Sequence, residues 1–578
     1  MTANAVPSPA PTTLHDPLTT TTAGATFPLY ITAFGGSSGG VSCGVVDAYD
    51  GDKKLRFWMD ALDPTAPPRV PTVDKQAIAT TEAASSAQLV RFTQGRASVS
   101  VQYKDTGRLA LQVLDGNASP EVRGATGSFV SLPADLKVVA VENESGEANP
   151  GSSTPTGKLF ARAGDPFVVT VDALDAEGER TPSFGRETVP EGIRLQSAAL
   201  VAPVGGRNGT TDEGTIENAT DFSADALPGR FVGKRFAFDE VGAIQLRASV
   251  ADDDFLGAGP VLGSASDVVG RFAPHHFTVV ANAPRFATGC AVGAFTWMGQ
   301  PFGYAPGFET ELIVTAVDRD GETTANYIDD WLRLSNATLA HRSYRAASGS
   351  VDESGLPAPT VDPAITTRND GSAILRFSSG SGIALVRGAP TAPFDAELEL
   401  SIDVLDADAT AYPSNPFRVG GTSAGAGIDF DVARRFQYGR VRLDNAFGSE
   451  LVTLPMRLRT QRFDGTAFGD DDADSCSRIP STAIRLTPSP ASLDARPSIA
   501  HLPLFSGDAG LTFAAPHVSG DVEVRVDLGA TGANLPWLRA DWPEDGNQDG
   551  LLDDDPRARA TFGIWEGRDA LIFQRELY

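Results

Sequence analysis

The sequence predicts an all-β protein made of tandem immunoglobulin-like β-sandwich modules, with a β-rich module at its C-terminal end. Three observations predict this fold. Short runs alternate apolar with polar residues, 59 glycines and 40 prolines indicate many turns, and 578 residues exceed what one hydrophobic core supports. We therefore expect several domains, each built mainly from strands.

Five runs alternate apolar and polar residues with a period of two, which is typical of half-buried antiparallel strands. They span 27–34, 97–103, 109–114, 243–250 and 398–405. The sequence lacks long stretches with the 3.6-residue period and the capping residues of helices. Helical content should therefore be small.

Two strand-and-turn segments resemble each other across the middle of the chain. In each, an alternating strand ends at an Asp-x-x-Gly turn, followed by a threonine and an aromatic residue. The same offset of 143 residues separates Asp175 from Asp318 and Phe184 from Tyr327. Bacterial immunoglobulin-like repeats commonly begin in this way. We expect the two aspartates to occupy the same turn in successive sandwiches.

A second internal similarity involves glycines. Tyr103-x-Asp105-x-Gly107 and Phe238-x-x-x-Gly242 each lead into an alternating strand. This pattern resembles the corner before the penultimate strand of an immunoglobulin sandwich, where glycine permits a tight turn with positive φ. The glycines mark folding units and do not suggest a phosphate-binding loop.

Segments rich in Gly, Ser, Pro and Thr suggest the borders between modules. We expect a Pro/Thr-rich linker over 1–24, immunoglobulin-like sandwiches over 25–145, 150–272 and 275–415, and the C-terminal β-rich module with its Asp-rich loop over 426–578.

The chain is strongly acidic, with 74 Asp and Glu against 47 Lys and Arg and a formal charge of −27. Such a surface repels phosphate backbones, so nucleic acid is not an expected partner. It fits secretion, a saline habitat or binding of divalent cations, and composition does not choose among these.

Neither a membrane span nor a secretion signal is evident. No part of the sequence approaches the roughly 18 consecutive apolar residues of a membrane helix, and the first 25 residues lack a signal-peptide core. A membrane-spanning protein is therefore not expected. For an extracellular or cell-surface protein, we expect the export signal to lie upstream, in a longer precursor.

The three cysteines, Cys43, Cys290 and Cys476, are far apart and lack the spacing of zinc or redox sites. A metal-thiolate centre is therefore excluded. In an oxidising compartment one disulfide could form, leaving one thiol over.

One acidic segment near the C-terminus resembles an EF-hand-type calcium loop. Its oxygen donors stand at positions 1, 3, 5 and 9, with glycine at position 6 and a backbone carbonyl at position 7. Position 12 is Pro556, so Asp554 or Asp555 would have to complete the ligand shell. We predict Ca²⁺ binding here, with an acidic solvated turn as the alternative. The predicted ligands are Asp545, Asn547, Asp549, Leu551 and Asp553.

No catalytic residue is predicted. Adjacent acids such as Asp329 and Asp330 would suggest a polysaccharide-acting enzyme only if a cleft held two carboxylates about 5 to 9 Å apart. Solvated turns are the better interpretation of such pairs, and we expect a protein that is not an enzyme.

Several phrases in the C-terminal half are specific enough to suggest a family. They resemble the C-terminal region of the MshQ-like family, whose members are associated with the mannose-sensitive haemagglutinin type IV pilus. The similarity covers roughly residue 27 to the end. The phrases are FTWMGQPF at 295–302, FQYGR at 436–440, DNAFGSE at 444–450, DSC at 474–476, WLRADW at 537–542, ATFGIW at 560–565 and RELY at 575–578.

The resemblance implies an exported bacterial protein, a non-enzymatic structural or adhesive component of a pilus or cell surface. Its expected partners are pilus or cell-surface proteins, and surface carbohydrate is a further candidate. Because Cys290 and Cys476 accompany family-like phrases, the resemblance also implies that they pair. The alternative functions are a carbohydrate-binding or other ligand-binding module and, less favoured, a polysaccharide-acting enzyme.

Overall fold

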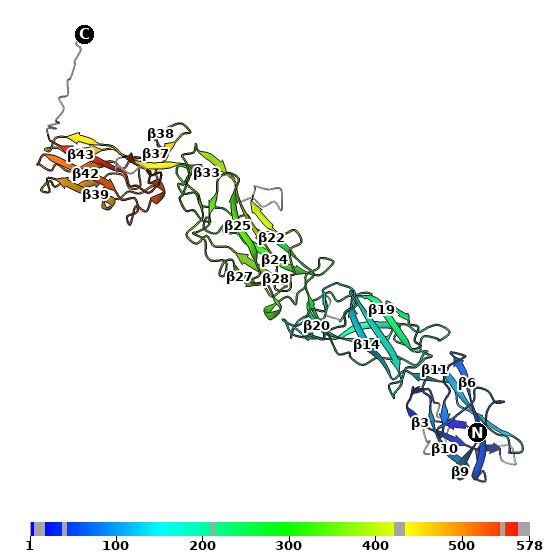
Figure 1. Ribbon diagram of the computed structural model, residues 1–578. Helices are drawn as coiled ribbons and strands as arrows, with labels where there is room; N and C mark the ends of the chain where they lie inside the picture. The colour runs from blue at the N-terminus through cyan, green and yellow to red at the C-terminus, as the bar shows by residue number, and fades with distance from the viewer. Residues whose placement is uncertain are drawn as a thin grey trace.

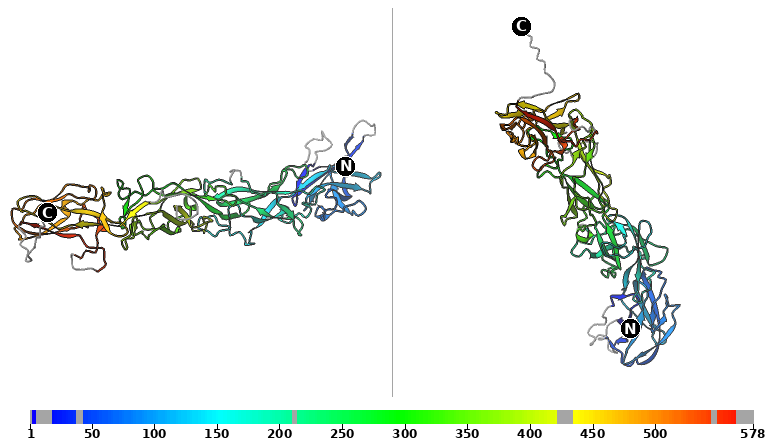
Figure 2. Two further views of the ribbon diagram at one scale, coloured as in Figure 1. Left: turned by 90° about the horizontal axis from the view of Figure 1, so that it is seen from above. Right: turned by 60° about the vertical axis from the view of Figure 1, so that its left-hand side comes forward.

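The computed structural model describes residues 2–4, 18–36, 43–209, 214–420, 434–543 and 549–563. Four β-sandwiches follow one another in chain order along a rod, with the first and the last at opposite ends (Figure 1). Two further views show the same elongated shape (Figure 2). The described residues contain short 3₁₀ turns but no α-helix, which confirms the all-β prediction.

Sandwich 1 (2–132) is organised around β11, which pairs with β6 on one side and with β12 and β13 on the other. Its interior is lined by alternating residues such as Ile31, Phe57, Phe92 and Val113. The strands are β1 (Thr2–Asn4), β2 (Thr20–Thr22), β3 (Thr26–Thr32), β4 (Phe34–Gly36), β5 (Cys43–Val45), β6 (Gly51–Asp63), β7 (Thr72–Val73), β8 (Gln76–Ala77), β9 (Ala87–Phe92), β10 (Arg96–Gln102), β11 (Gly107–Asp115), β12 (Val122–Ala125) and β13 (Phe129–Leu132).

Sandwich 2 (134–273) packs two four-stranded sheets around a core rich in phenylalanine. One sheet has the order β14-β16-β19-β18 and the other β15-β21-β20-β17. The strands are β14 (Asp135–Asn143), β15 (Ala161–Arg162), β16 (Phe167–Leu174), β17 (Ile193–Ala202), β18 (Phe222–Ala224), β19 (Arg230–Phe236), β20 (Gly242–Val250) and β21 (Val268–Ala273).

Sandwich 3 (274–437) divides its strands among one four-stranded sheet and smaller sheets of two and three strands. They are β22 (His276–Ala281), β23 (Thr296–Trp297), β24 (Glu311–Val317), β25 (Ala340–Ala346), β26 (Val351–Asp352), β27 (Ala364–Thr367), β28 (Ser372–Arg376), β29 (Ala384–Leu385), β30 (Phe394–Ala396), β31 (Leu398–Asp403), β32 (Phe417–Gly420) and β33 (Arg434–Gln437), with the 3₁₀ turn η1 (Asp329–Trp331).

Sandwich 4 (438–563) places the sheet β35-β43-β42-β39 against two three-stranded sheets. Its elements are β34 (Gly439–Leu443), β35 (Ala446–Gly448), β36 (Leu454–Met456), β37 (Leu458–Phe463), β38 (Phe468–Asp470), η2 (Ser481–Ala483), β39 (Ile484–Ser489), β40 (Pro497–Ile499), β41 (Leu511–Phe513), β42 (Gly520–Val526), η3 (Pro536–Leu538) and β43 (Arg557–Phe562).

Several module borders differ from those expected from the composition of the sequence, because strand pairing assigns the border strands to a different sandwich. β14 pairs with β16, so sandwich 1 ends near residue 132 instead of 145. β1 and β2 pair with β3 and β13, so part of the expected linker 1–24 belongs to sandwich 1. β33 pairs with β23 and β30, so sandwich 3 extends to residue 437.

The structure confirms the 143-residue repeat. Asp175 and Asp318 each follow the second long strand of their sandwich, and each carboxylate accepts two backbone N–H bonds of 2.8 to 3.0 Å from its own turn. Phe184 and Tyr327 are buried at corresponding positions. Sandwiches 2 and 3 therefore begin in the same way.

Candidate functional site

Buried charged side chains gather at the three junctions where one sandwich meets the next. We call the end of a sandwich that contacts the following one its trailing end. In sandwiches 1 to 3 a short strand pairs in parallel with the last strand at this end: β2 with β13, β15 with β21 and β23 with β33. The three trailing ends therefore share one backbone arrangement.

A glycine in the left-handed region follows each short strand by two residues. The φ values are +77° for Gly24, +80° for Gly164 and +80° for Gly299. A Cβ atom on Gly24 would lie 2.9 Å from the backbone nitrogen of Ala176, and one on Gly164 would lie 2.7 Å from Cβ of Arg319. Both contacts are with the next sandwich. Glycine is thus required by backbone conformation and by close approach.

The glycine N–H also positions a charged residue. It donates to the carbonyl of Tyr103, Phe238 or Leu385 over 2.7, 2.9 and 2.8 Å in sandwiches 1, 2 and 3, respectively. The residue two positions after that carbonyl is charged in all three sandwiches. These residues are Asp105, Glu240 and Arg387.

At the first junction, Asp105 is fully buried and accepts two hydrogen bonds from Ser183 of sandwich 2. The Ser183 backbone N–H donates to Oδ1 over 2.9 Å and its hydroxyl donates to Oδ2 over 2.8 Å. Burial raises the pKa of the Asp105 carboxyl, and the Ser183 bonds oppose that rise. Nearby, the Ala176 N–H donates to the Ala23 carbonyl over 2.8 Å. The junction is thus closed by directional polar contacts.

The second junction repeats these contacts with a glutamate. Glu240 Oε1 accepts from the Ala325 N–H over 2.7 Å, and Oε2 accepts from the Asn326 N–H over 3.0 Å. The Arg319 N–H donates to the Ala163 carbonyl over 3.1 Å. Burial raises the pKa of Glu240 to about 7, although the backbone bonds oppose the rise. Asn326 stands 143 residues after Ser183, so the repeated turn supplies both donors.

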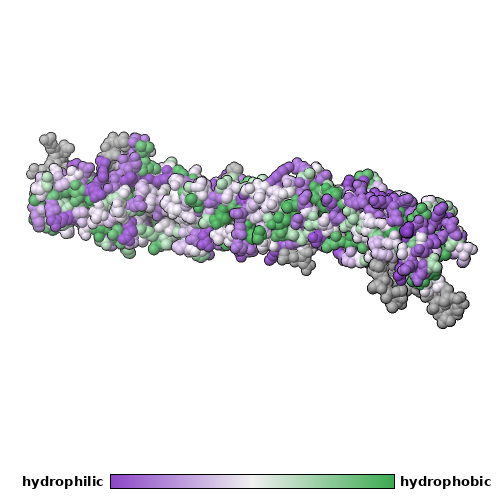
Figure 3. Space-filling view, turned by 90° about the horizontal axis from the view of Figure 1, so that it is seen from below, coloured by the Kyte–Doolittle hydropathy of each residue, from purple (hydrophilic) through white to green (hydrophobic). Residues whose placement is uncertain are grey.

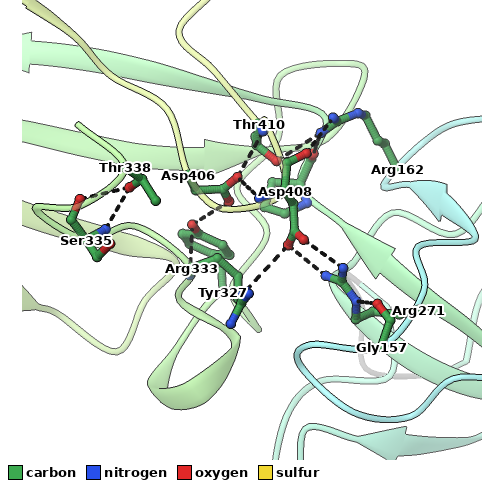
Figure 4. Close-up of polar contacts among 11 residues, drawn as sticks. Gly157, Arg162, Arg271, Tyr327, Arg333, Ser335, Thr338, Asp406, Asp408 and Thr410 are labelled. Carbon is green, nitrogen blue, oxygen red and sulfur yellow. Dashed lines mark hydrogen bonds and ion pairs between the residues drawn. The ribbon is translucent and has the colours of Figure 1, made fainter. Parts of the chain in front are cut away.

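A buried ion pair also crosses the second junction (Figure 4). Arg271 on β21 makes two hydrogen bonds of 2.7 Å to the Asp408 carboxylate, and its Nε donates to the Gly157 carbonyl over 2.9 Å. Arg162 donates to the Thr410 hydroxyl over 2.9 Å and to the Asp408 carbonyl over 3.2 Å. Two arginines of sandwich 2 thus clamp one turn of sandwich 3.

The clamped turn is held from within sandwich 3. Asp406 Oδ1 accepts from the backbone N–H groups of Asp408 and Thr410 over 2.8 and 2.9 Å. Its Oδ2 accepts from the Tyr327 hydroxyl over 2.7 Å (Figure 4). Tyr327 is the aromatic residue of the 143-residue repeat, so the repeated segment of sandwich 3 both contacts sandwich 2 and holds the turn that the two arginines contact.

The third junction has an arginine in the corner and a covalent link. Arg387 donates to the Gly439 carbonyl over 2.8 Å, and its guanidinium lies 4.5 Å from the centre of the Tyr438 ring. Cys290 and Cys476 form a disulfide with Cα atoms 5.4 Å apart. Trp297, although on β23 of sandwich 3, is buried in the core of sandwich 4. A side chain of sandwich 3 therefore forms part of the hydrophobic core of sandwich 4.

The predicted calcium ligands are only partly within the described residues. Asp545 and Asn547 lie outside them. Asp549 accepts from the Leu551 N–H over 2.9 Å, and Asp553 lies on the same exposed stretch. Within the described ranges, no group of three or more His, Cys, Asp or Glu residues is arranged to hold a metal ion. Calcium binding stays a prediction.

The other acidic residues considered from the sequence have structural partners or point to solvent. Asp554 accepts from the Trp542 N–H over 3.1 Å, and Asp555 accepts from the Leu528 N–H over 3.0 Å. Asp329 and Asp330 lie exposed on the η1 turn. None of the helical turns in the described part of the chain is long and apolar enough to cross a membrane.

Comparisons with known proteins give one family. Models described as the first, immunoglobulin-like domain and the second, third and fourth domains of DUF6701, a domain of unknown function, match residues 11–128, 132–227, 240–426 and 437–577. The comparison with curated proteins finds no match.

Among solved structures, invasin, a bacterial integrin-binding protein, is 9% identical with a TM-score of 0.25, over 95% of this chain and 78% of invasin. A fragment of intimin in complex with its receptor domain is 12% identical with a TM-score of 0.19, over 47% and 67%. Domains 1–6 of the surface layer protein SbsC are 7% identical with a TM-score of 0.16, over 94% and 53%. TM-scores this low carry no inference about function.

Proposed function

The chain belongs to the four-domain DUF6701 family, and we propose that it serves as a non-enzymatic stalk in an extracytoplasmic structural or adhesive component. The stalk would hold a functional end away from a bacterial cell surface or a type IV pilus. The observation that carries this proposal is the short parallel strand, the left-handed glycine and the charged corner residue repeated at the three junctions. Buried charge is placed where it fixes one sandwich on the next.

Short connections support a rigid rod. Two residues separate β13 from β14, two separate β21 from β22, and one separates β33 from β34. Connections of this length allow little bending by themselves, and the junction contacts restrict it further. Hydrophilic and hydrophobic residues are interspersed along the face shown in Figure 3, as on an ordinary solvated surface. A rod of this kind suits the spacing of a binding end from an anchor.

The association with a pilus is the finer part of the proposal. It rests on the phrases that resemble the MshQ-like family, several of which lie in sandwich 4. FQYGR at 436–440 includes Tyr438 and Gly439, which Arg387 contacts at the third junction. FTWMGQPF at 295–302 includes Trp297 and Gly299 of the same junction. These two phrases thus coincide with contacts that join sandwiches 3 and 4.

Small-angle X-ray scattering of the full chain tests the stalk. A compact protein of this length has a radius of gyration of about 25 Å, whereas the rod should give a much larger value. Scattering profiles from several salt concentrations should superimpose, because the junctions are buried. A compact particle, or a broad ensemble of bent shapes, would contradict the proposal. For the surface location, an epitope inserted after Gly307, an exposed turn residue of sandwich 3, should bind antibody on intact bacteria.

Carbohydrate binding is the second candidate, favoured by one hollow on sandwich 3. The hollow has a volume of about 650 Å³ and combines apolar with charged lining. Glu309, Arg376 and Ser379 are among its lining residues and could bond sugar hydroxyls. Glycan-array binding that is lost in Arg376→Ala would favour this function over a plain stalk.

A further inference from the structure

The end of sandwich 4 at which β43 finishes has the same backbone arrangement as the trailing ends of sandwiches 1 to 3 but different side chains. β35 pairs in parallel with β43, which pairs with β42, as β15 pairs with β21 and β21 with β20. Gly520 opens β42 opposite Phe562, and Gly242 opens β20 opposite Phe272. The face that sandwiches 1 and 2 use for docking is therefore present again.

The two residues that define a junction are replaced on this face. In the strand pairing, Gly448 opposite Phe562 corresponds to Ala161 opposite Phe272. Three residues further along, Leu451 therefore takes the position of Gly164. Val518 precedes Gly520 by two residues, as Glu240 precedes Gly242. A side chain thus replaces the required glycine, and an apolar residue replaces the buried acid.

Four large apolar side chains are exposed around these positions, and we call them the apolar end. Their exposed fractions are 61% for Phe447, 63% for Leu451, 59% for Val452 and 38% for Val518. The His517 N–H donates to the Glu450 carbonyl over 2.9 Å, which places Val518 beside Leu451. Grouped apolar residues on a solvated protein indicate a contact surface.

A further sandwich that docks as sandwiches 2 and 3 do does not fit the apolar end. Sandwiches 2 and 3 present the backbone N–H groups of Ser183 and Asn326, which need a carboxylate acceptor. If such a sandwich docked here, the corresponding N–H group would be buried against Val518 without an acceptor. The unsatisfied donor would weaken the contact by about 1 to 3 kcal/mol. Leu451 would also occupy the space that the incoming turn takes at Gly164. The occupant must itself be apolar.

We propose that the occupant is a second copy of this chain, so that two rods join end to end through their apolar ends. A two-fold axis brings each apolar residue against the same surface of the partner copy. The rim carries opposite charges: Glu450 lies beside Gly563, and Arg559 lies beside Phe447, where it makes a long, exposed ion pair of 3.9 Å with Asp521. A two-fold axis can set Glu450 of one copy against Arg559 of the other.

The size of the contact sets its strength. One end of a sandwich offers a small area, at or below the low end of about 1,200 Å² for specific interfaces. We therefore expect a dissociation constant in the micromolar range, about 10⁻⁶ to 10⁻⁴ M. The dimer would be twice the length of one rod, with the two N-terminal sandwiches at its far ends.

Sedimentation equilibrium of the full chain tests the proposal, in a Cys43→Ser background that prevents cross-linking through this thiol. The mass should rise from 60.5 kDa towards twice that value with increasing concentration. The double variant Leu451→Glu and Val452→Glu should stay at 60.5 kDa with an unchanged melting temperature. Leu89→Glu and Val204→Glu, whose side chains are 68% and 97% exposed elsewhere on the rod, should dimerise like the parent protein.

Disulfide trapping tests the geometry independently. Leu451→Cys should form a covalent dimer on oxidation, whereas Leu89→Cys should not. A parent protein that stays monomeric at about 100 μM overturns the proposal, since a contact of this kind should be populated there. So does a dimer that survives the double glutamate variant, which would point to another surface or to a head-to-tail arrangement. A monomer that dimerises only after removal of 564–578 also overturns it, because that segment would then be the occupant.

Discussion

Asn326 donates its backbone N–H to the Glu240 carboxylate across the second junction, over 3.0 Å, and Ser183 makes the equivalent bond to Asp105 across the first, over 2.9 Å. Both donors belong to the turn that recurs after 143 residues, and both acceptors belong to the recurring corner two residues before a glycine. The two internal similarities in the sequence are therefore the two halves of one contact. This makes the junctions the natural place to test the rod.

Gly164→Ala should weaken the second junction. The new Cβ would lie 2.7 Å from Cβ of Arg319, and the backbone has a φ of +80°. We expect a loss of about 1 to 3 kcal/mol in the free energy of unfolding, measured by chemical denaturation. Gly178→Ala is the matched control, because its φ is +83° and, apart from its chain neighbours, no described residue has an atom within 4 Å of its new Cβ. Equal losses in both variants would show that strain alone is responsible.

Arg271→Ala should destabilise the protein by about 3 to 5 kcal/mol, because it leaves the buried Asp408 carboxylate without its main partner. Scattering should also show a bend between sandwiches 2 and 3. Arg194→Ala removes an arginine from a more exposed pair with Asp253 inside sandwich 2 and should cost less than about 1 kcal/mol. A rod that keeps its shape in Arg271→Ala would contradict the role assigned to this ion pair.

The fold class was predictable because alternation of apolar and polar residues directly reflects which face of a strand is buried. All five predicted runs overlap strands, from β3 (Thr26–Thr32) to β31 (Leu398–Asp403). The module borders were less predictable, because composition cannot show which sheet a strand joins. β14 (Asp135–Asn143) looks like a continuation of sandwich 1 and pairs instead with β16.

The junction residues were partly visible in the sequence. In the sequence the corner pattern is defined by its glycines, and nothing local distinguishes the acids two residues earlier, Asp105 and Glu240, from solvated acids. Their recurrence before both glycines was the available signal. No such signal marks Arg387 in the sequence, because the corner of sandwich 3 lacks a glycine equivalent to Gly242. Phe394, opposite Phe436, takes its place. Partners distant in sequence, such as Asp408 for Arg271, needed the structure.

The stability of the second junction should fall as pH rises through neutrality. Burial raises the pKa of Glu240 from 4.5 to about 7, with a contribution from the nearby Asp239 charge. Its contribution is therefore complete below about pH 4.5 and is lost as pH rises through about 7, with an upper limit of about 3 kcal/mol. Denaturation between pH 5 and pH 8 should show this fall, and Glu240→Gln should reduce it.

Glu187 provides the control for this pH effect. It is buried inside sandwich 2, and burial raises its pKa to about 7 as well. Glu187→Gln should reduce the pH dependence of stability without changing the angle between sandwiches 2 and 3 in scattering. If Glu240→Gln leaves the pH dependence unchanged, the carboxylate does not titrate in this range.

Removal of the disulfide should destabilise sandwich 4. Cys290 and Cys476 are 186 residues apart, and a loop of this length gives an upper limit of about 5 kcal/mol in the loop-entropy description. We expect Cys290→Ser with Cys476→Ser to lower the melting temperature of the C-terminal part, followed by calorimetry with and without reductant. Reductant should have no further effect on this variant. An unchanged transition would mean that Trp297 and Arg387 hold the third junction without the covalent link.

Calcium should raise the melting temperature of sandwich 4, if the acidic loop binds it as the sequence predicts. Asp545, Asp549 and Asp553 are spaced as ligands, and close carboxylates repel one another unless a cation offsets their charge. Extracellular modules often bind with dissociation constants of about 10⁻⁴ to 10⁻³ M, so 10 mM calcium should add about 1.5 to 3 kcal/mol. Calorimetry in calcium and in chelator measures the difference.

Asp549→Ala should abolish the calcium-dependent shift and leave the transitions of sandwiches 1 to 3 in place. Asp494→Ala, which removes another exposed aspartate of sandwich 4, should keep the shift, because it changes the net charge equally without touching the loop. Magnesium should have a smaller effect, since its small octahedral shell suits a loop of this type poorly. Identical melting curves in calcium and in chelator would identify the segment as a solvated acidic turn.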